Sequence, residues 1–178
     1  MTNRQPTDVK NLDQYGNPPL EWKRALDLLD AQPRSGVDFP TFVNTVDKTC
    51  RPHSAAIAAY WLDGAMYFVS GASTRKSGNI AENPACTITA HLKGMDLVLE
   101  GEASRVTDSG TLQSLASRYR ELGWPVEVEG IAFMAPYTAP SGGPPPWNLY
   151  RLEPRTVYGV AGEEPGGATR WRFSNESQ

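Results

Sequence analysis

The chain has 178 residues, a formal net charge of -3 at neutral pH and 39% hydrophobic residues. This length is typical of a single domain with a sizeable core, and the hydrophobic content argues against a largely disordered chain. A nucleic-acid-binding domain usually carries an excess or a stripe of basic residues. The acidic balance therefore favours neither DNA nor RNA as a partner.

The first 17 residues are polar and lack the apolar core of a signal peptide. The longest apolar run, Ala55–Leu62, is far too short to span a bilayer. We therefore expect a cytoplasmic protein without a membrane partner. Residues 1–17 are predicted to form a flexible tail, and residues 18–178 a single domain.

The two cysteines, Cys50 and Cys86, lie far apart and have no histidine or cysteine neighbours at metal-ligand spacing. We expect two unlinked thiols and no metal site. A disulfide between them is the open alternative.

The first predicted element is a helix. Asn17 has the character of an N-cap, and Pro18 suits the first helical position, where the missing N–H of proline costs nothing. Apolar residues then recur at helical spacing, namely Trp22, Ala25, Leu26 and Leu29. The helix is predicted to end before Pro33.

Five strand-like runs follow, joined by short turns. They are Thr41–Val46, His53–Leu62, Ala65–Ser70, Ala85–Leu92 and Asp96–Val106. The second run is mostly apolar, which predicts burial on both faces, and Asp63-Gly64 after it predicts a two-residue hairpin turn. Gly101 indicates a bulge in the fifth run. One or two helical turns are predicted over Gly78–Asn83.

A second helix is predicted from a cap at Asp108 to a stop at Gly123. The next segment, Trp124–Pro146, is irregular and rich in proline, glycine and alanine. The last predicted strands are Leu149–Leu152, Thr156–Val160 and Thr169–Phe173. Five strands in series before the main helix favour an antiparallel barrel, so the expected fold class is mainly β (α+β) with a few flanking helices.

The loop after the third strand has the composition of a phosphate site. It reads Ser70-Gly71-Ala72-Ser73-Thr74-Arg75-Lys76. Small residues let an anion approach the backbone amides, arginine and lysine supply charge, and the helix that follows adds its positive end. A solvated basic turn is the alternative. The pattern is neither a P-loop nor a dinucleotide-binding glycine motif.

Other candidates for chemistry are weaker. Glu100 and Glu102 fall on one face of a strand and could act as an acid/base pair, but a solvated face is favoured. His53 and His91 are the only histidines. His53 could bind a cofactor or substrate, although an ordinary histidine at a strand end is favoured for both. No residue stands out as catalytic.

Several short motifs, in order along the chain, resemble one family. They are Arg51-Pro52-His53-Ser54-Ala55, Trp61-Leu62-Asp63-Gly64, Ser70-Gly71, Arg75-Lys76, Asn79-Ile80-Ala81, Asp96-Leu97-Val98-Leu99-Glu100-Gly101 and Gly143-Pro144-Pro145-Pro146-Trp147. Together they resemble the pyridoxamine 5'-phosphate oxidase-like superfamily, and most closely its actinobacterial flavin/deazaflavin oxidoreductase branch. The resemblance covers nearly the whole chain after Asp38.

The resemblance implies a split β-barrel homodimer with two cofactor sites at the dimer interface. The cofactor-binding residues it implies, with the candidates above, are His53, Ser54, Ala55, Ala56, Ile57, Ser70, Gly71, Ser73, Arg75, Lys76, Asn79, Pro146 and Trp147. The strand residues would line the cofactor ring and the loop residues would hold its phosphate. Trp147 would stack on the ring or roof the substrate pocket, or else be a core or interface tryptophan.

The chain departs from pyridoxamine 5'-phosphate oxidase itself near the C-terminus. That enzyme carries an Arg-x-His element for its pyridoxal substrate, whereas this chain reads Thr169-Arg170-Trp171-Arg172-Phe173. Vitamin B6 oxidation is therefore not expected. Arg170 and Trp171 stay as weaker site candidates.

The reaction that the resemblance implies is hydride transfer from the reduced deazaflavin coenzyme F-420 to an activated double bond of a small organic substrate. FMN is the alternative cofactor. The acidic tail of F-420 would suit Arg75 and Lys76, with Arg24, Arg51 or Lys93 as helpers. A non-catalytic cofactor or haem carrier is the alternative function. The segment Trp124–Trp147 would shape the substrate pocket.

Overall fold

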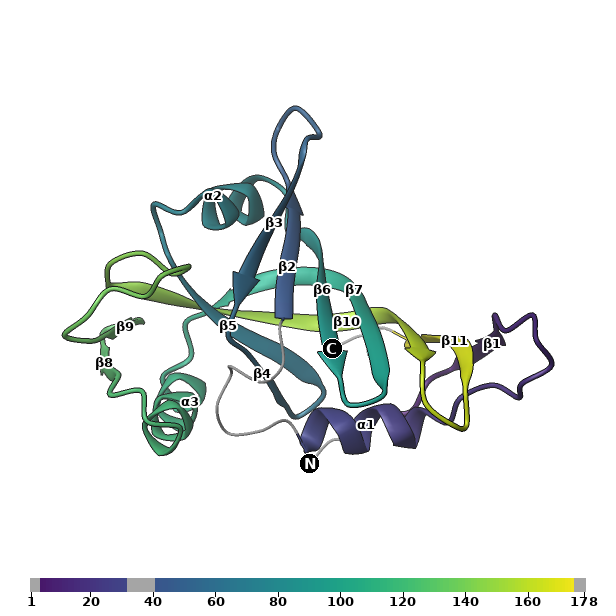
Figure 1. Cartoon of the computed structure of the whole chain (residues 1–178). Coiled ribbons are helices and arrows are strands. Elements are labelled where there is room, and N and C mark those ends of the chain that lie inside the picture. Colours follow the sequence, from purple (N-terminus) through teal and green to yellow (C-terminus); the bar gives the residue numbers. More distant parts are fainter. Residues whose placement is uncertain (1–3, 32–40, 175–178) are drawn as a thin grey trace.

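The computed structural model describes residues 4–31 and 41–174 (Figure 1). One sheet runs through this part of the chain, with helices packed around it. The strands are β1 (Asp8–Asn11), β2 (Thr41–Val46), β3 (Pro52–Ile57), β4 (Ala59–Leu62), β5 (Ala65–Gly71), β6 (Ala85–Leu92), β7 (Met95–Val106), β8 (Glu127–Glu129), β9 (Ala132–Met134), β10 (Trp147–Ala161) and β11 (Gly167–Arg172). The helices are α1 (Trp22–Asp30), α2 (Arg75–Glu82) and α3 (Ser109–Glu121).

The sheet is antiparallel throughout and is organised by its longest strand, β10. The strand path runs β1-β11-β10-β7-β6-β2-β3, and β5 joins from the side by pairing with β10 and β4. The first half of β10 pairs with β5 while its second half pairs with β11, so the sheet curls around this strand. The predicted fold class, mainly β with an antiparallel barrel and a few helices, is confirmed.

The two strands predicted around Glu153-Pro154 are a single strand with a bulge. The register between β10 and β7 shifts between Pro154 and Thr156, opposite Gly101. A Cβ atom on Gly101 would lie 2.4 Å from the carbonyl oxygen of Glu153, so only glycine fits there. The irregularity predicted at Gly101 is present, but the extra residue lies in β10.

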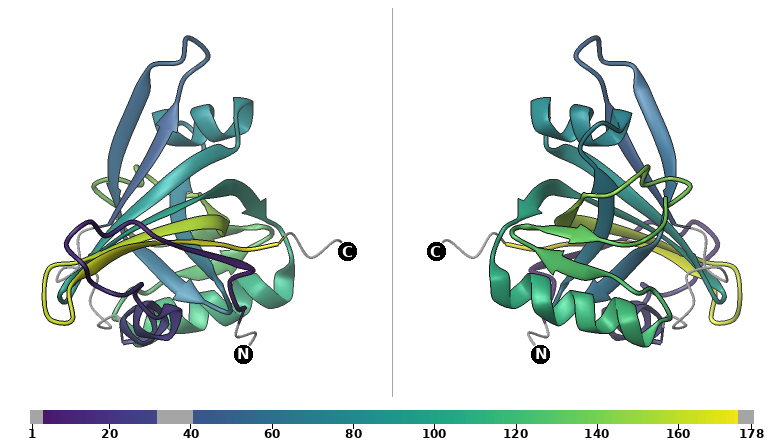
Figure 2. Two further views of the ribbon diagram at one scale, coloured as in Figure 1. Left: turned by 90° about the vertical axis from the view of Figure 1, so that its right-hand side faces the viewer. Right: turned by 90° about the vertical axis from the view of Figure 1, so that its left-hand side faces the viewer.

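Two cores lie on the two faces of the curled sheet. The first is closed by α1, where the Trp22 ring lies 5.3 Å from that of Trp171 and 5.0 Å from that of Phe173. The second is closed by α3, with Tyr119 and Phe133 among its buried side chains. Figure 2 shows α1 and α3 at one end of the molecule and α2 beside the projecting β2–β3 hairpin at the other.

The helix boundaries differ from the prediction at two places. The first helix begins at Trp22 rather than Pro18, because Asp13 accepts hydrogen bonds from the backbone and side chain of Asn17 at 2.8 and 3.1 Å. The second begins at Arg75, three residues before the predicted start, because the Thr74 side chain caps it. The third helix is capped by Asp108 as predicted.

The run predicted as one strand buried on both faces is also corrected. It is divided into β3 and β4, and β3 lies at the end of the sheet path with residues exposed along one face. Its alanines and serine were too small to reveal which face is covered. The predicted hairpin turn is confirmed, since Asp63 and Gly64 have φ values of 48° and 81°.

The segment predicted as a tail contains a strand. Residues Asp8–Asn11 form β1 and pair with β11, and the Arg170 guanidinium donates to the Asp8 carboxylate at 2.7 Å. Both cysteines are free thiols, Cys50 exposed and Cys86 buried, and burial raises the pKa of the Cys86 thiol to about 12. None of the helices in the described ranges is long and apolar enough to cross a membrane.

Candidate functional site

The predicted phosphate loop lies at one end of the barrel. We define the α2 corner as the loop from Ser70 to Thr74, the first turn of α2 and the Ala139–Gly143 turn that packs on them. The loop leaves the end of β5, and an isolated bridge between Ala139 and Gly143 closes the facing turn. The loop follows β5 and the turn precedes β10, and these two strands are paired, so the two halves of the corner lie side by side.

Three hydroxyl groups hold the loop in shape. The Ser70 hydroxyl lies 2.7 Å from that of Thr74 and accepts from that of Ser77 at 2.9 Å. Thr74 also donates to the carbonyl oxygen of Gly71 at 3.0 Å. Ser70 was predicted to contact phosphate, but its buried hydroxyl is used inside this network. Thr74 was predicted as part of the phosphate loop, but its role as the helix cap was not predicted, although threonine is a preferred N-cap residue.

Lys76 is the most unusual residue of the corner. It is only 3% exposed, and its ammonium group donates to the carbonyl oxygen of Ser141. Burial lowers the pKa of this ammonium, and no carboxylate in the described part of the chain pairs with it. A buried ammonium has three donors, so Lys76 keeps donor capacity and an uncompensated charge.

Arg75 faces the other way, since consecutive helical residues do not share a face. Its guanidinium is about half exposed and lies 3.4 Å from the carboxylate of Asp47, in the turn after β2. Asp47 also accepts from the hydroxyl of Thr49 and the backbone N–H of Arg51, and these bonds with the nearby Arg75 charge lower its pKa to about 2. Asp47 was missed, although an aspartate two residues before a threonine is a recognisable turn signal.

The remaining loop residues divide into buried and exposed ones. Asn79 is buried and donates to the Thr45 hydroxyl at 2.9 Å, so it ties α2 to β2 and does not point outward. Ala72 and Ser73 are exposed. Within the described chain their backbone amides donate no hydrogen bond, which leaves two adjacent donors for an anion.

Gly71 brings the loop into contact with the Ala139–Gly143 turn. Its backbone N–H donates to the carbonyl oxygen of Gly142 at 2.8 Å. A Cβ atom on Gly71 would lie 2.7 Å from that same oxygen and 3.3 Å from the carbonyl oxygen of Pro144. The close approach of the two backbones therefore requires glycine. The sequence had predicted a small residue here for a different reason, namely to let an anion reach the backbone amides.

Trp147 belongs to the second core. It is fully buried, its indole N–H donates to the carbonyl oxygen of Gly143 at 2.8 Å, and its ring lies 5.6 Å from that of Tyr137. Of the two alternatives for this residue, the structure supports the core tryptophan over a ring-stacking one. Pro146, predicted beside it, is exposed and follows a cis peptide bond.

The predicted ring-lining residues do not share one face. Along β3 the side chains alternate, so Ser54 and Ala56 are exposed while Ile57 is buried and Ala55 packs against the first core. His53 is half-buried on the core-facing side. A planar ring lying on this face of β3 could contact Ser54 and Ala56 but not Ile57.

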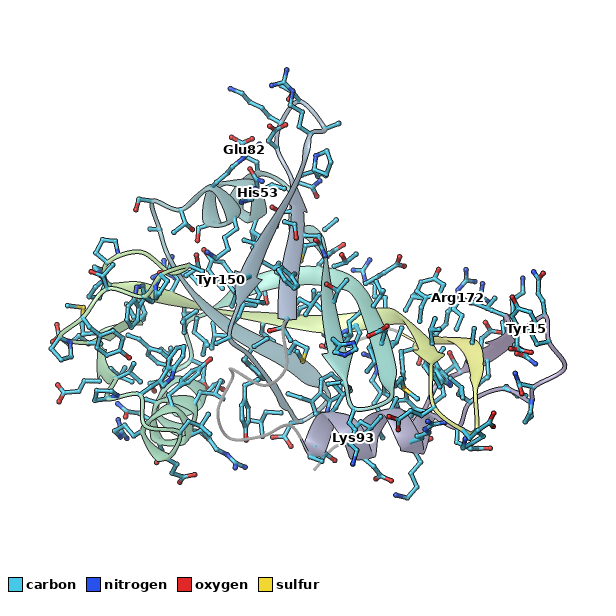
Figure 3. The ribbon with its side chains drawn as sticks, viewed as in Figure 1. Tyr15, His53, Glu82, Lys93, Tyr150 and Arg172 are labelled. Carbon is cyan, nitrogen blue, oxygen red and sulfur yellow. The ribbon has the colours of Figure 1, made fainter. Side chains whose placement is uncertain are left out.

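The three predicted helper cations are not gathered at the α2 corner. Figure 3 shows Lys93 beside α1, at the opposite end from His53 and Glu82, which lie near α2. Arg24 of α1 donates to the carbonyl oxygens of Pro165 and Glu163 in the β10–β11 turn. Only Arg51, in the β2–β3 turn with Asp47, is close to the corner.

The weaker candidates have structural roles. His91 lies 2.5 Å from the Asp96 carboxylate on the exposed β6–β7 hairpin, and Glu102 pairs with Arg155 at 3.1 Å on the surface. Trp171 is buried against Trp22. These contacts agree with the solvated face that the sequence favoured for Glu102.

A groove lies at the opposite end of the barrel from the α2 corner. We define the α1 groove as the space of about 510 Å³ between α1, β4 and α3. Aromatic and aliphatic side chains line much of it, including Trp22, Leu26, Tyr60, Trp61 and Phe173. No residue of Trp124–Trp147 contributes to its wall, so the predicted substrate-pocket segment does not form this groove.

Several solved structures have a fold similar to that of this chain. A pyridoxamine 5'-phosphate oxidase-related, FMN-binding protein from Nostoc punctiforme aligns with a TM-score of 0.57 and 16% identity, over 88% of this chain and 91% of that one. PhzG from Burkholderia lata aligns with a TM-score of 0.54 and 18% identity, over 92% of each chain. General Stress Protein 26 from Bacillus anthracis gives 0.52 and 16%, over 82% and 95%. These likenesses show the fold.

No curated protein sequence matches the chain. A family model does match, however, and it spans residues 39–161, more than two thirds of the sequence. Its description is pyridoxamine 5'-phosphate oxidase. The matched stretch includes β2, β3, the whole α2 corner and all of β10. The protein is therefore an oxidoreductase that belongs to the pyridoxamine 5'-phosphate oxidase family.

Proposed function

We propose that the protein binds a phosphorylated flavin-type cofactor with its phosphate at the α2 corner, and that it reduces an activated double bond of a small organic substrate. The preferred cofactor is the deazaflavin F-420, with FMN as the alternative. Membership of a flavin-binding oxidoreductase family supports the cofactor class. The choice of F-420 rests on the motifs that resemble the deazaflavin-using branch.

The observation that carries this proposal is the buried charge of Lys76, which pairs with no carboxylate among residues 4–31 and 41–174. Burial disfavours the charged form of this ammonium and lowers its pKa, and an anion beside it would offset that cost. A dianionic phosphate at the start of α2 would supply the missing negative charge. The adjacent amides of Ala72 and Ser73 and the positive end of the helix would add further attraction.

The residues of the corner fit a phosphate in different ways. Arg75 can donate from the exposed side, where its partner Asp47 is 3.4 Å away and the contact is weak. Gly71 lets the two loops lie close, and the hydroxyl network of Ser70 fixes the loop before an anion arrives. When bound, the cofactor would supply the hydride chemistry. The chain would bind it, orient it and exclude water.

The outer face of β3 and its neighbours offers room for the cofactor ring. Ser54 and Ala56 present small side chains there, and register pairing places Asn44 and Phe42 of β2 beside them. Small side chains would let a flat ring lie close to the backbone. We propose this face, and not the core-facing side with Ile57, as the ring site.

The same sheet face supports the proposal of a homodimer. Cross-strand register places Phe42, Thr89, Val98 and Tyr158 in one row across four strands, and Phe42 is 39% exposed. A second copy covering this row would bury it and enclose the ring site. Light scattering should then give twice the chain mass, and Phe42→Glu should give the monomer mass. A monomeric wild type would contradict the dimer.

The proposed function is tested by titrating the purified protein with F-420, FMN, FAD and haem. We expect micromolar or tighter binding of F-420 or FMN. Lys76→Met and Arg75→Ala should each weaken it by about 10- to 100-fold, from roughly 1.5–3 kcal/mol per charge-assisted hydrogen bond. Lys93→Ala, at the other end of the barrel, is the matched control and should leave affinity unchanged. Failure of the wild type to bind either cofactor would overturn the proposal.

A further inference from the structure

The geometry points to a second role for Lys76: it is a positioning residue that ties the Ala139–Gly143 turn to the start of α2, so that anion binding at the α2 corner and the order of this turn are coupled. The coupling, though not the tie itself, rests on the proposed function. Nothing in the sequence distinguishes this lysine from Arg75 beside it, since both read as phosphate-binding cations.

Two hydrogen bonds connect the Ala139–Gly143 turn to the α2 side of the corner, one from a side chain and one from the backbone. The Lys76 ammonium donates to Ser141, at the tip of the turn, while the backbone of Gly71 donates to Gly142. The turn is closed on itself by two bonds between Ala139 and Gly143, at 2.8 and 3.1 Å. Trp147 then fixes its far side through Gly143. Only the Lys76 bond comes from a side chain of α2.

The charge of Lys76 explains why binding at the corner would affect the turn. The carbonyl oxygen of Ser141 occupies one donor of the ammonium, and the others remain for an anion. An anion on those donors would compensate the buried charge and hold the ammonium in place, which would strengthen its bond to Ser141. By linkage, an ordered turn must raise anion affinity by the same factor that the anion raises the order of the turn.

The turn is in a position to shape a substrate site. Tyr137, Ser141 and Pro146 are exposed along this segment, next to the loop where the phosphate would lie. Their placement depends on the turn, which is anchored in the second core by Ala139 and tied to α2 at Ser141 by Lys76. Lys76 would thus transmit the presence of the cofactor to the wall of the pocket that receives the substrate.

Hydrogen exchange of the Ala139 and Gly143 amides in the cofactor-free protein tests the tie without reference to any cofactor. We expect these amides to exchange about tenfold or more faster in Lys76→Met than in wild type. Arg75→Ala is the matched control, because it removes the neighbouring cation but not the tie, and should exchange at the wild-type rate. Equal exchange in Lys76→Met and wild type would overturn the inference.

Addition of inorganic phosphate tests the coupling. Saturating phosphate should slow exchange of the same amides in wild type by at least threefold and should have no effect in Lys76→Met. If phosphate binds wild type without changing the exchange, the coupling is wrong. If no phosphate or cofactor binds, the proposed function fails, while the difference between the cofactor-free proteins still decides the tie. Lys76→Gln serves as a second variant, should Lys76→Met not fold.

Discussion

The two ends of the barrel differ in character. The α1 groove is large and aromatic, and each cation on its wall has a partner: Arg4 pairs with Glu153 at 3.0 Å, Lys23 pairs with Asp27 at 2.6 Å, and Arg118 lies 5.8 Å from the centre of the Tyr60 ring. The α2 corner is polar, and its most buried cation has no counter-ion in the described chain.

The two ends therefore give different grounds for expecting a binding site: the volume of a groove at one end and, at the other, a buried charge that no carboxylate of the described residues pairs with. The α1 groove owes its walls to the residues that close the first core, so its aromatic lining is explained by folding stability. Folding stability does not explain the buried charge of Lys76 at the α2 corner, because burying a charge costs stability. We take the unexplained cost as the better guide to function. Substitutions at the α1 end should therefore lower mainly stability, and substitutions at the α2 corner should lower mainly cofactor affinity.

The largest effect on stability is expected from Trp22→Ala at the α1 end. Trp22 is buried between Trp171 and Phe173, and its indole N–H donates to the backbone carbonyl of Arg4 at 3.0 Å. Removing a buried tryptophan costs about 3–5 kcal/mol of unfolding free energy. Denaturant unfolding should show this loss, while the folded variant should bind the cofactor with wild-type affinity.

Tyr15→Ala is the control for Trp22→Ala, because Tyr15 is an aromatic residue that is 93% exposed. It should leave both stability and binding unchanged. If Trp22→Ala abolished cofactor binding in protein that is still folded, the comparison would be wrong, and the α1 groove would become the better candidate for the site.

The sequence predicted most of the fold because its signals are local. Alternating residues in Thr41–Val46, the turn at Asp63-Gly64 and the cap at Asp108 each specify one element, and all three are confirmed. The errors occur where a distant contact decides. Strand β1 exists because β11 offers it a partner, and β10 is continuous because Gly101 of β7 accommodates its bulge.

The sequence predicted where the candidate site lies, but not which partner each of its residues contacts. Composition identified the loop, yet it could not show that Lys76 and Arg75 face different partners, since both partners lie far away in sequence, at Ser141 and Asp47. For the same reason Trp147 looked equally suited to a ring contact and to the core. Only its bond to Gly143 and its complete burial distinguish the two.

A smaller loss of stability, with a larger loss of binding, is expected from Gly71→Ala at the α2 corner. The added methyl would meet the backbone oxygens of Gly142 and Pro144, which cannot rotate away. Overpacking of this kind costs about 1–3 kcal/mol. Because the turn must move away from the loop, cofactor affinity should fall as well, and Trp147 fluorescence should change with it.

Gly78→Ala is the matched control for this substitution. Gly78 lies inside α2 and is exposed, and a Cβ atom there would meet nothing within 4 Å. Alanine in a helix interior should stabilise the protein by about 0.5–1 kcal/mol. Equal effects of the two glycine substitutions would show that the approach of the two loops is not required, which would remove the structural basis of the α2 corner.

The smallest effect is expected from Asp47→Asn, and it separates the two cations of the corner. The pKa of Asp47 is held at about 2, below the ordinary 3.8, chiefly by the Thr49 hydroxyl and the Arg51 amide. A carboxylate with a lowered pKa stabilises the folded state above its ordinary pKa, and this stabilisation is lost as the pH falls towards 2. Wild type should therefore lose a small increment of stability between about pH 4 and pH 2 that the asparagine variant lacks.

At neutral pH the same substitution should leave cofactor affinity unchanged or raise it slightly, because the ion pair at 3.4 Å is exposed and weak and its removal releases Arg75 for the anion. Added salt should reduce any gain, since the contact is exposed. Calorimetric titration at low and high salt measures both effects. A large loss of affinity would mean that Asp47 must hold Arg75 in place for binding. Arg75 on the exposed side would then matter as much for binding as Lys76 on the buried side.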